Sequence, residues 1–402
     1  MDCDKIKLNI FVFRYRHFTL NTTLVHISRI VAAVIALTAG CVGSAAQDIN
    51  IPERWNLITG EVPALYSRDT LTICVLGDIM MHTKQIEDAL RQDGTYEFKC
   101  FDSLRDRIAS ADLAIANMEF TLAGRPYTGY PQFSAPESFA SYLAECGFDI
   151  FLTANNHILD RGSAGAMRTL NIYGSLEDSH GIRYTGSYKD ADDKLKRNPL
   201  SIRRKGYNLA LVNLTYGTNL GKTRIWPEIN YTGEEKKIEE MMNNKADMTI
   251  VFPHWGQEYH LKHSSAQEKT ASWLAENGAD LILGAHPHVV QDYGTAGVAK
   301  IPVAYSLGNA VSNMSADNTQ IELMATVKIT RDENGDPQLL PIEFTYLWCS
   351  RPGGYTDTYM VLPVEEFIGT RESWTGKWEY DKMIKTYHHV INETGIKDKI
   401  NE

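Results

Sequence analysis

The stretch "LILGAHPHVVQ", residues 281–291, is an aliphatic run that stops at a glycine and is followed by two histidines with one proline between them. A short apolar run bounded by turn residues predicts a buried strand. In α/β proteins, ligands bind beyond the carboxyl ends of such strands. Imidazole is a common metal ligand, and Pro287 fixes the backbone between His286 and His288. We therefore predict that this strand ends in a metal-binding pair of histidines.

The same pattern, an apolar run with a polar end, recurs along the chain. It occurs at residues 71–82, 110–120, 147–160, 245–259 and 301–312, which read LTICVLGDIMMH, SADLAIANMEF, GFDIFLTANNHILD, KADMTIVFPHWGQEY and IPVAYSLGNAVS. Segments with apolar residues at helical spacing precede three of these strands, at 136–146, 234–244 and 265–277. Antiparallel hairpins are expected around Lys205-Gly206 and Asn334-Gly335. The alternation of helices and strands predicts an α/β fold, a sheet with helices on its faces.

The predicted strand ends carry side chains that suit a metal site. Each one alone has an ordinary explanation, such as a helix cap, a solvated acid, a turn or a hydrogen-bonded histidine. Their recurrence at the same place in successive strands predicts instead that they converge. Carboxylates, amide oxygens and imidazoles bind Mn, Fe or Zn, so we expect one or two divalent metal ions here. The candidate metal ligands are Asp78, Glu119, Asn156, His254, His286 and His288.

Six short motifs carry a resemblance to a known family. They are GDIMMH, ANMEF, TANNHILDRG, HWGQEY, GAHPHVVQ and YSLGNAV, in this order between about residues 71 and 311. The series resembles that of the CapA/PgsA family, the bacterial capsule (poly-γ-glutamate) synthesis proteins, which is similar to the calcineurin-like metallophosphoesterases. The resemblance implies an α/β/β/α sandwich of two mixed sheets flanked by helices, spanning residues 71–362.

The resemblance also implies roles for individual residues. Asp78 matches the first metal-binding aspartate, Glu119 falls where a carboxylate bridges two metals, and Asn156 matches the amide ligand. His254, His286 and His288 match the histidine ligands. His157 matches a catalytic histidine, which Asp160 is close enough to orient. One departure puts the number of metals in doubt: Met80 stands where the phosphoesterases have a histidine, and His82 is displaced from that place.

The first residues predict export. Basic side chains precede the apolar run IVAAVIALTAG at residues 30–40, which is too short for a comfortable membrane span. Cleavage of a signal peptide after residue 46 is one reading, and a lipoprotein signal to residue 40, with lipid on Cys41, is another. An uncleaved anchor is the third. Residues 47–70 read as a lead-in segment and residues 363–402 as a charged, helical extension.

Charge and cysteine content argue against certain partners and kinds of site. The formal net charge is -10, and residues 1–46 are basic, so the remainder is still more acidic. Such a chain repels phosphate backbones, and we expect no nucleic-acid partner. The six cysteines show no C-x-x-C spacing and predict neither a disulfide framework nor a thiolate metal site.

The expected function is therefore that of an exported capsule- or poly-γ-glutamate-biosynthesis protein in the periplasm or cell envelope. It would act as a metal-dependent hydrolase on a phosphoester or polymer. The alternative is a non-catalytic, metal-stabilised component of an exopolymer assembly complex. The expected partners are an anionic substrate or exopolymer and membrane-bound capsule assembly proteins.

Overall fold

The computed structural model describes residues 70–221 and 226–399. The predicted signal segment, residues 1–46 with Cys41, therefore lies outside the described residues, as does the lead-in segment up to residue 69. No helix in the described ranges is both long enough and apolar enough to cross a membrane.

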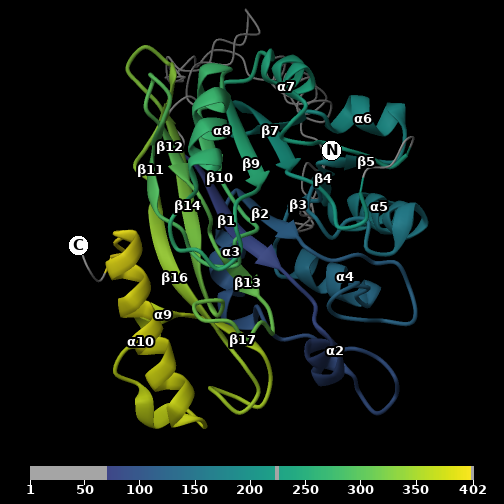
Figure 1. The fold of residues 1–402 in the computed structure, drawn as a ribbon, viewed down its shortest axis with the longest axis vertical. Coiled ribbons are helices and arrows are strands. Elements are labelled where there is room, and N and C mark those ends of the chain that lie inside the picture. The colour runs from purple at the N-terminus through teal and green to yellow at the C-terminus, as the bar shows by residue number, and fades with distance from the viewer. Residues whose placement is uncertain (1–69, 222–225, 400–402) are drawn as a thin grey trace, which may run out of the picture. The chain divides into compact units, whose positions relative to one another are not determined.

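A mixed nine-stranded sheet forms one layer (Figure 1). Its main path runs β17-β16-β14-β1-β2-β3-β4, while β13 pairs with β1 and β15 pairs with β14. Strands β1 to β4 are parallel, and β14 is antiparallel to β1. The strands are β1 (Leu71–Ile79), β2 (Leu113–Met118), β3 (Ile150–Leu152), β4 (Arg183–Thr185), β13 (Asn309–Val311), β14 (Ile321–Arg331), β15 (Pro337–Leu339), β16 (Glu343–Ser350) and β17 (Met360–Pro363).

A six-stranded sheet forms the second layer, in the order β11-β12-β10-β9-β7-β6. Its four inner strands are parallel, and the two edge strands are antiparallel to their neighbours. These strands are β6 (Leu200–Arg204), β7 (Tyr207–Thr215), β9 (Met248–His254), β10 (Leu281–Leu283), β11 (Tyr293–Ala296) and β12 (Ile301–Ala304). Two short strands, β5 (Ser187–Tyr188) and β8 (Glu228–Ile229), form a separate pair.

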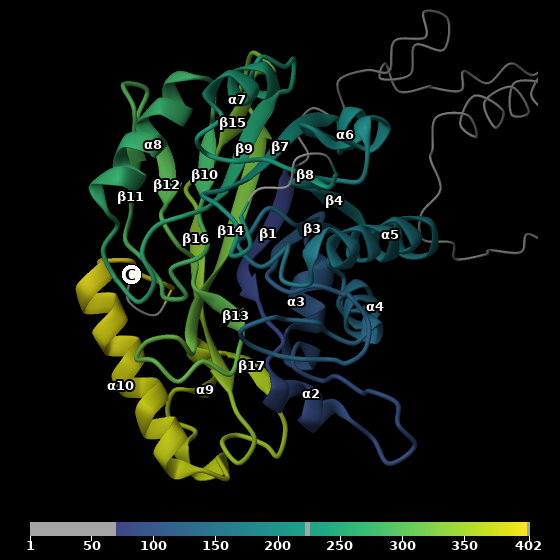
Figure 2. The same cartoon turned by 45° about the vertical axis from the view of Figure 1, so that its right-hand side comes forward.

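The two sheets pack face to face, and most of the helices cover their outer faces (Figures 1 and 2). Apolar side chains of both sheets, such as Val75 and Ile250, share the central core. The helices are α2 (Thr83–Ala89), α3 (Arg105–Ser110), α4 (Glu137–Glu145), α5 (Gly162–His180), α6 (Ala191–Arg197), α7 (Glu235–Met242), α8 (Ser265–Glu276), α9 (Val364–Phe367) and α10 (Lys377–Thr394), with 3-10 turns at Asp102–Leu104 and Arg371–Ser373. The predicted sandwich of two mixed sheets flanked by helices is confirmed.

The local sequence explains these elements. β1 is buried along nearly its whole length, which is why it reads as a continuous apolar run instead of an alternating one. Three of the helices, α4, α7 and α8, coincide with the predicted amphipathic segments. The β6–β7 hairpin turns at Lys205 and Gly206, which both have positive φ, as a tight two-residue turn requires.

The last helix, α10, packs on the strands β14 and β16 (Figure 2). Its apolar side chains, among them Met383 and Tyr387, join the central core. The carboxylate of Glu379 is fully buried and accepts hydrogen bonds from Nε2 of Gln320 (3.0 Å) and Oγ of Ser350 (3.1 Å). Residues beyond 362 therefore contribute to the same core as the strands of the sandwich.

Candidate metal centre

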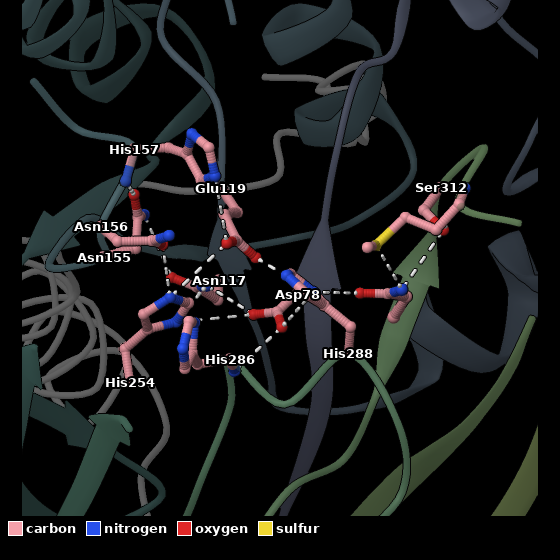
Figure 3. Close-up of polar contacts among 12 residues, drawn as sticks. Asp78, Asn117, Glu119, Asn155, Asn156, His157, His254, His286, His288 and Ser312 are labelled. Carbon is pink, nitrogen blue, oxygen red and sulfur yellow. Dashed lines mark hydrogen bonds and ion pairs between the residues drawn. The ribbon is translucent and has the colours of Figure 1, made fainter. Parts of the chain in front are cut away.

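The structure brings all six candidate ligands together at the carboxyl ends of strands from both sheets (Figure 3). The first sheet supplies Asp78 from β1, Glu119 after β2 and Asn156 after β3. The second sheet supplies His254 from the end of β9, and His286 and His288 after β10. All six are at most 3% exposed. We call this group the carboxylate–histidine cluster.

Two glycines let β1 approach the neighbouring loop closely enough to place Asp78. A Cβ atom on Gly77 would lie 2.0 Å from the carbonyl oxygen of Gly308. That same oxygen accepts a hydrogen bond from the backbone N–H of Asp78 at 2.9 Å. Gly308 has a φ of +87°, which glycine adopts without steric cost. Only a backbone without side chains at these two places can hold Asp78 in this way.

The backbone of the His-Pro-His segment is strained. His286 has a φ of +98° and His288 a φ of +60°, values that residues other than glycine rarely adopt. The backbone N–H of His286 donates a hydrogen bond to Oδ2 of Asp78 at 3.0 Å, which holds the segment against β1. Such strain persists where the surrounding structure enforces it, and it is concentrated at functional sites.

Asp78 is the anchored carboxylate of the cluster. Its Oδ1 accepts a hydrogen bond from Nδ2 of Asn117 at 2.6 Å, and its Oδ2 lies 3.6 Å from Nδ1 of His288. Burial alone would raise the pKa of Asp78, but contacts with His288, His254 and Asn117 hold this pKa well below its ordinary value. Asp78 is therefore a charged, well-partnered ligand candidate.

Glu119, unlike Asp78, is a buried carboxylate without hydrogen-bond partners in the described part of the chain. Among the described residues, neither of its carboxylate oxygens has a hydrogen-bond partner, although both are buried. The nearest imidazole nitrogens are Nε2 of His254 at 3.5 Å and Nδ1 of His288 at 3.8 Å. Burial, and next the Asp78 carboxylate, raise the pKa of Glu119 well above its ordinary value. An unpartnered buried carboxylate is costly, so this geometry calls for a cation between these groups.

The donor atoms fit two metal positions that share one ligand. Glu119, His286 and His288 place ligand atoms within 4.8 Å of one another, and so do Asp78, Glu119 and His254. Glu119 belongs to both groups, as a bridging carboxylate would. Within the described ranges, Nδ1 of His286 also lacks a hydrogen-bond partner. Buried, orphaned oxygen and nitrogen donors of this kind suit Zn, Mn or Fe.

Two of the three candidate histidine ligands are held in the form that binds metal. The exception is His288: burial opposes its charged form, but contacts with Asp78 and Asn309 raise its pKa above the ordinary value. Burial lowers the pKa of His254 to about 3 and the pKa of His286 well below its ordinary value. Both rings are therefore neutral near pH 7, and a metal ligand must be neutral imidazole. Nε2 of His254 lies 2.8 Å from Oδ1 of Asn156, so the candidate amide ligand contacts a candidate histidine ligand directly.

The two candidate catalytic residues lie beside the cluster and contact each other. Nδ1 of His157 donates a hydrogen bond to Oδ2 of Asp160 at 2.7 Å. The other ring nitrogen, Nε2, faces the cluster and lies 3.9 Å from Oε1 of Glu119. Asp160 thus fixes the ring of His157 with one nitrogen directed toward the site.

Two residues that contact the carboxylate–histidine cluster were not predicted as site residues. Asn117 contacts both Asp78 (2.6 Å) and Nδ1 of His254 (3.2 Å), and Asn309 accepts from Nδ1 of His288 at 2.9 Å. A sequence signal for Asn117 exists, because it stands two residues before Glu119 and a strand directs alternate side chains to the same face. Asn309 follows Gly308 in the last quoted motif.

The departure at Met80 has a clear structural outcome. Met80 is buried in the apolar core between the first sheet and its helices. Nδ1 of the nearby His82 accepts a hydrogen bond from the backbone N–H of Asn313 at 3.2 Å. Neither residue belongs to the two ligand groups found in the described part of the chain.

Two proteins named CapA are similar to this chain in sequence. The capsule biosynthesis protein CapA of Bacillus anthracis is 28% identical over 291 residues, which cover 68% of this chain and 67% of that protein. The PGA biosynthesis protein CapA of Bacillus subtilis (strain 168) is 26% identical over 293 residues, covering 69% and 73%.

Solved structures with a similar fold include a novel phosphatase from Mycoplasma pneumoniae, with a TM-score of 0.44 and 13% identity over 70% of this chain and 94% of that one. The NAD nucleotidase of Haemophilus influenzae has a TM-score of 0.44 and 11% identity, covering 81% and 61%. The predicted resemblance itself is confirmed at the level of the family. The model of the bacterial capsule synthesis protein family PGA_cap matches residues 72–314, and the chain belongs to that family.

Proposed function

We propose that this protein is a metal-dependent phosphoester hydrolase that acts in the biosynthesis of a capsule or related exopolymer. The observation that carries the proposal is Glu119, a buried carboxylate without a hydrogen-bond partner in the described part of the chain, shared by two groups of ligand atoms. A site with one shared carboxylate between two ion positions is the arrangement that two-metal hydrolases use.

The residues that would hold the ions are the six of the carboxylate–histidine cluster. Bound divalent ions supply Lewis-acid chemistry, in which water becomes more acidic and a phosphoryl oxygen is polarised. They also make an anionic substrate acceptable to an acidic protein, because a bound cation dominates the field near it.

The chain's own contribution to the reaction is the pair His157 and Asp160. Because Nδ1 of His157 is committed to Asp160, Nε2 is the nitrogen available to the site. In the proposed reaction His157 delivers a proton to the leaving oxygen, and Asp160 keeps the ring in the correct tautomer and orientation. The backbone N–H of Phe133 also donates to Oδ2 of Asp160 (2.8 Å), which stiffens the pair.

The setting that we propose is the cell envelope. Both named relatives are capsule or PGA biosynthesis proteins. Residues 1–46 have the composition of an export signal, and Cys41 is the site at which a lipid anchor would attach. The proposed partners are an anionic substrate or exopolymer and membrane-bound capsule assembly proteins.

A second function is favoured by one observation. Every cluster side chain is at most 3% exposed, so the site is nearly closed to solvent. A closed metal site is typical of a structural role. In this alternative the metals stabilise a non-catalytic component of the assembly complex.

One experiment separates the two functions. The purified protein is loaded with Mn, Fe or Zn, its metal content is measured, and it is assayed on a panel of phosphoesters and γ-glutamyl polymers. The hydrolase predicts turnover that His157→Ala removes without loss of metal. The matched control is His263→Ala, since Nδ1 of His263 also pairs with an aspartate, Asp292, at 2.9 Å but outside the cluster. Bound metal without turnover on any compound would favour the structural role.

A further inference from the structure

Two tyrosines beside the carboxylate–histidine cluster are exposed to solvent. Tyr216 is 50% exposed, and its ring centroid lies 4.7 Å from that of His286. Tyr259 is 46% exposed, and its ring lies 6.3 Å from that of His288. The histidines themselves are almost fully buried. Each tyrosine therefore presents an exposed ring next to one of the proposed ligands.

The backbone holds both tyrosines in fixed places relative to the cluster. The N–H of Tyr216 donates to the carbonyl oxygen of His254 at 3.0 Å, and the N–H of Tyr259 donates to that of Pro287 at 2.8 Å. Tyr259 has a φ of +68°, which is unusual for a bulky side chain. The backbone of each tyrosine is thus hydrogen-bonded to a segment that carries a candidate ligand. The backbone of Tyr259 is also held in a strained conformation.

A third exposed tyrosine lies on the side of the candidate acid. Tyr130 is 74% exposed, and its ring is 6.4 Å from that of Phe133, which in turn lies 4.7 Å from the ring of His157. On the other side of the site, burial and then Glu258 raise the pKa of Tyr259 to about 12, so Glu258 lies beside that tyrosine. Tyr130, Tyr216 and Tyr259 are called the tyrosine rim below.

The chemistry of the rim selects a kind of substrate. Exposed tyrosine rings bind flat or CH-rich ring faces by stacking, and their hydroxyls bind polar groups at the edge of the ring. The neighbouring carboxylate of Glu258 repels additional negative charge. A rim of this kind therefore suits an uncharged ring attached to the phosphoryl group, and it disfavours a second anionic group at the same place.

We infer, on the basis of the proposed function, that the substrate is a phosphomonoester whose leaving group carries an uncharged ring, and that the tyrosine rim binds this ring. In the reaction, water adds to phosphorus and the bond from phosphorus to the ring-bearing oxygen breaks. The leaving oxygen takes one proton and the products are inorganic phosphate and a ring-bearing alcohol. A sugar and a nucleobase both offer such a ring, and the experiment distinguishes them.

The test compares three phosphomonoesters with the metal-loaded protein: ribose 5-phosphate, adenosine 5′-monophosphate and glycerol 1-phosphate. The wild-type protein is expected to prefer at least one ring-bearing ester over glycerol phosphate by about tenfold or more in kcat/KM. Preference for both ring-bearing esters identifies the sugar as the bound ring, and preference for the nucleotide alone identifies the base. No preference for either one would overturn the inference.

Variants show whether the rim causes the preference. Tyr216→Leu combined with Tyr259→Leu should reduce kcat/KM for the preferred ester at least five times more than for glycerol phosphate, mainly through KM. Tyr216→Phe with Tyr259→Phe keeps the rings and should restore most of the preference. Tyr293→Leu, at an exposed tyrosine on β11 that packs on Phe344, is the control and should change neither value. An equal loss on all three esters would contradict the assignment.

Failure of the proposed function is recognised separately. If the metal-loaded protein hydrolyses neither these three esters nor any compound of the wider panel described above, the hydrolase proposal fails. Binding of the same compounds, measured by calorimetry, then tests the rim alone. Equal affinity of the wild-type protein and the double leucine variant for the ring-bearing esters would overturn the inference, and a weaker affinity of the variant would support it.

Discussion

Oδ2 of Asp160 accepts two hydrogen bonds, from Nδ1 of His157 at 2.7 Å and from the backbone N–H of Phe133 at 2.8 Å. The carboxylate therefore fixes the histidine from outside the carboxylate–histidine cluster, and its removal should alter catalysis without removing metal. We expect Asp160→Asn to lower kcat by about 10- to 100-fold, because the ring loses its preferred tautomer, while metal content stays unchanged. Steady-state kinetics and metal analysis check this. Wild-type kcat in the variant would show that the pair is not used.

Glu119→Gln should make the metal-free protein more stable while weakening its binding of metal ions. The metal-free wild-type protein buries Glu119 without a hydrogen-bond partner among the described residues and close to Asp78. Replacing that carboxylate by a neutral amide should raise the melting temperature of the metal-free protein by a few degrees, which corresponds to roughly 1–2 kcal/mol. The same change should reduce the number of bound ions, since both ligand groups contain Glu119.

Thermal unfolding in a chelator and metal analysis after dialysis provide the two measurements for Glu119→Gln. A variant that retains the full metal content of the wild-type protein would contradict the bridging role. A matched control is Glu258→Gln, next to the tyrosine rim, which should leave the number of bound ions unaltered.

Glu322 should make the metal-free protein less stable as the pH rises. Its carboxyl group is fully buried on β14, Oε1 accepts the backbone N–H of Gly77 at 2.6 Å, and Oε2 has no partner in the described ranges. Burial raises the pKa of Glu322 well above its ordinary value of 4.5. The folded protein therefore keeps a proton that the unfolded chain releases above that pH, and stability falls as the pH rises.

The comparison that isolates this group is wild type against Glu322→Gln. The unfolding free energy of Glu322→Gln minus that of the wild-type protein should increase with pH. The increase should be up to about 1.4 kcal/mol per pH unit between about pH 5 and pH 7. Urea unfolding with a chelator present measures it. A difference that stays constant over this range, or one that shifts toward the wild-type protein, would contradict the raised pKa.

The close approach of Gly77 to Gly308 predicts a severe effect of one methyl group. In Gly77→Ala, the new Cβ atom would lie 2.0 Å from a backbone oxygen, so β1 and β13 must separate. We expect a loss of more than about 4 kcal/mol of stability, or failure to fold. Gly294→Ala on β11 is the control, because a Cβ there meets nothing within 4 Å in the described structure, and it should cost less than about 1 kcal/mol. Similar stability of the two variants would show that β1 is not packed this tightly.

Much of this architecture could be predicted from the sequence because its buried strands have a recognisable residue pattern. Buried parallel strands read as uninterrupted apolar runs, and polar residues directly after them mark the edge where their carboxyl ends meet. That is why Asp78, Glu119 and the histidines could be assigned to one place although they are up to about two hundred residues apart. The helices before three of the strands were equally visible from their spacing.

Other parts of the site depend on tertiary contacts that no local pattern carries. Asn309 contacts His288 only because β13 pairs with β1. Tyr216 lies beside His286 only because β9 pairs with both β7 and β10. The apolar face of α10 was hidden by its charged composition, although Tyr380, Met383, Tyr387 and Val390 follow helical spacing.

The packing of α10 has a consequence for where the working unit ends. The match to the family stops at residue 314, yet Glu379 of α10 binds Gln320. The carbonyl oxygen of the preceding residue, Thr319, accepts a hydrogen bond from Nδ2 of Asn309, whose side chain contacts His288. A fragment trimmed to residues 72–314 would thus lack the backbone that holds Asn309 against His288. The folding unit therefore extends beyond the family match and includes α10.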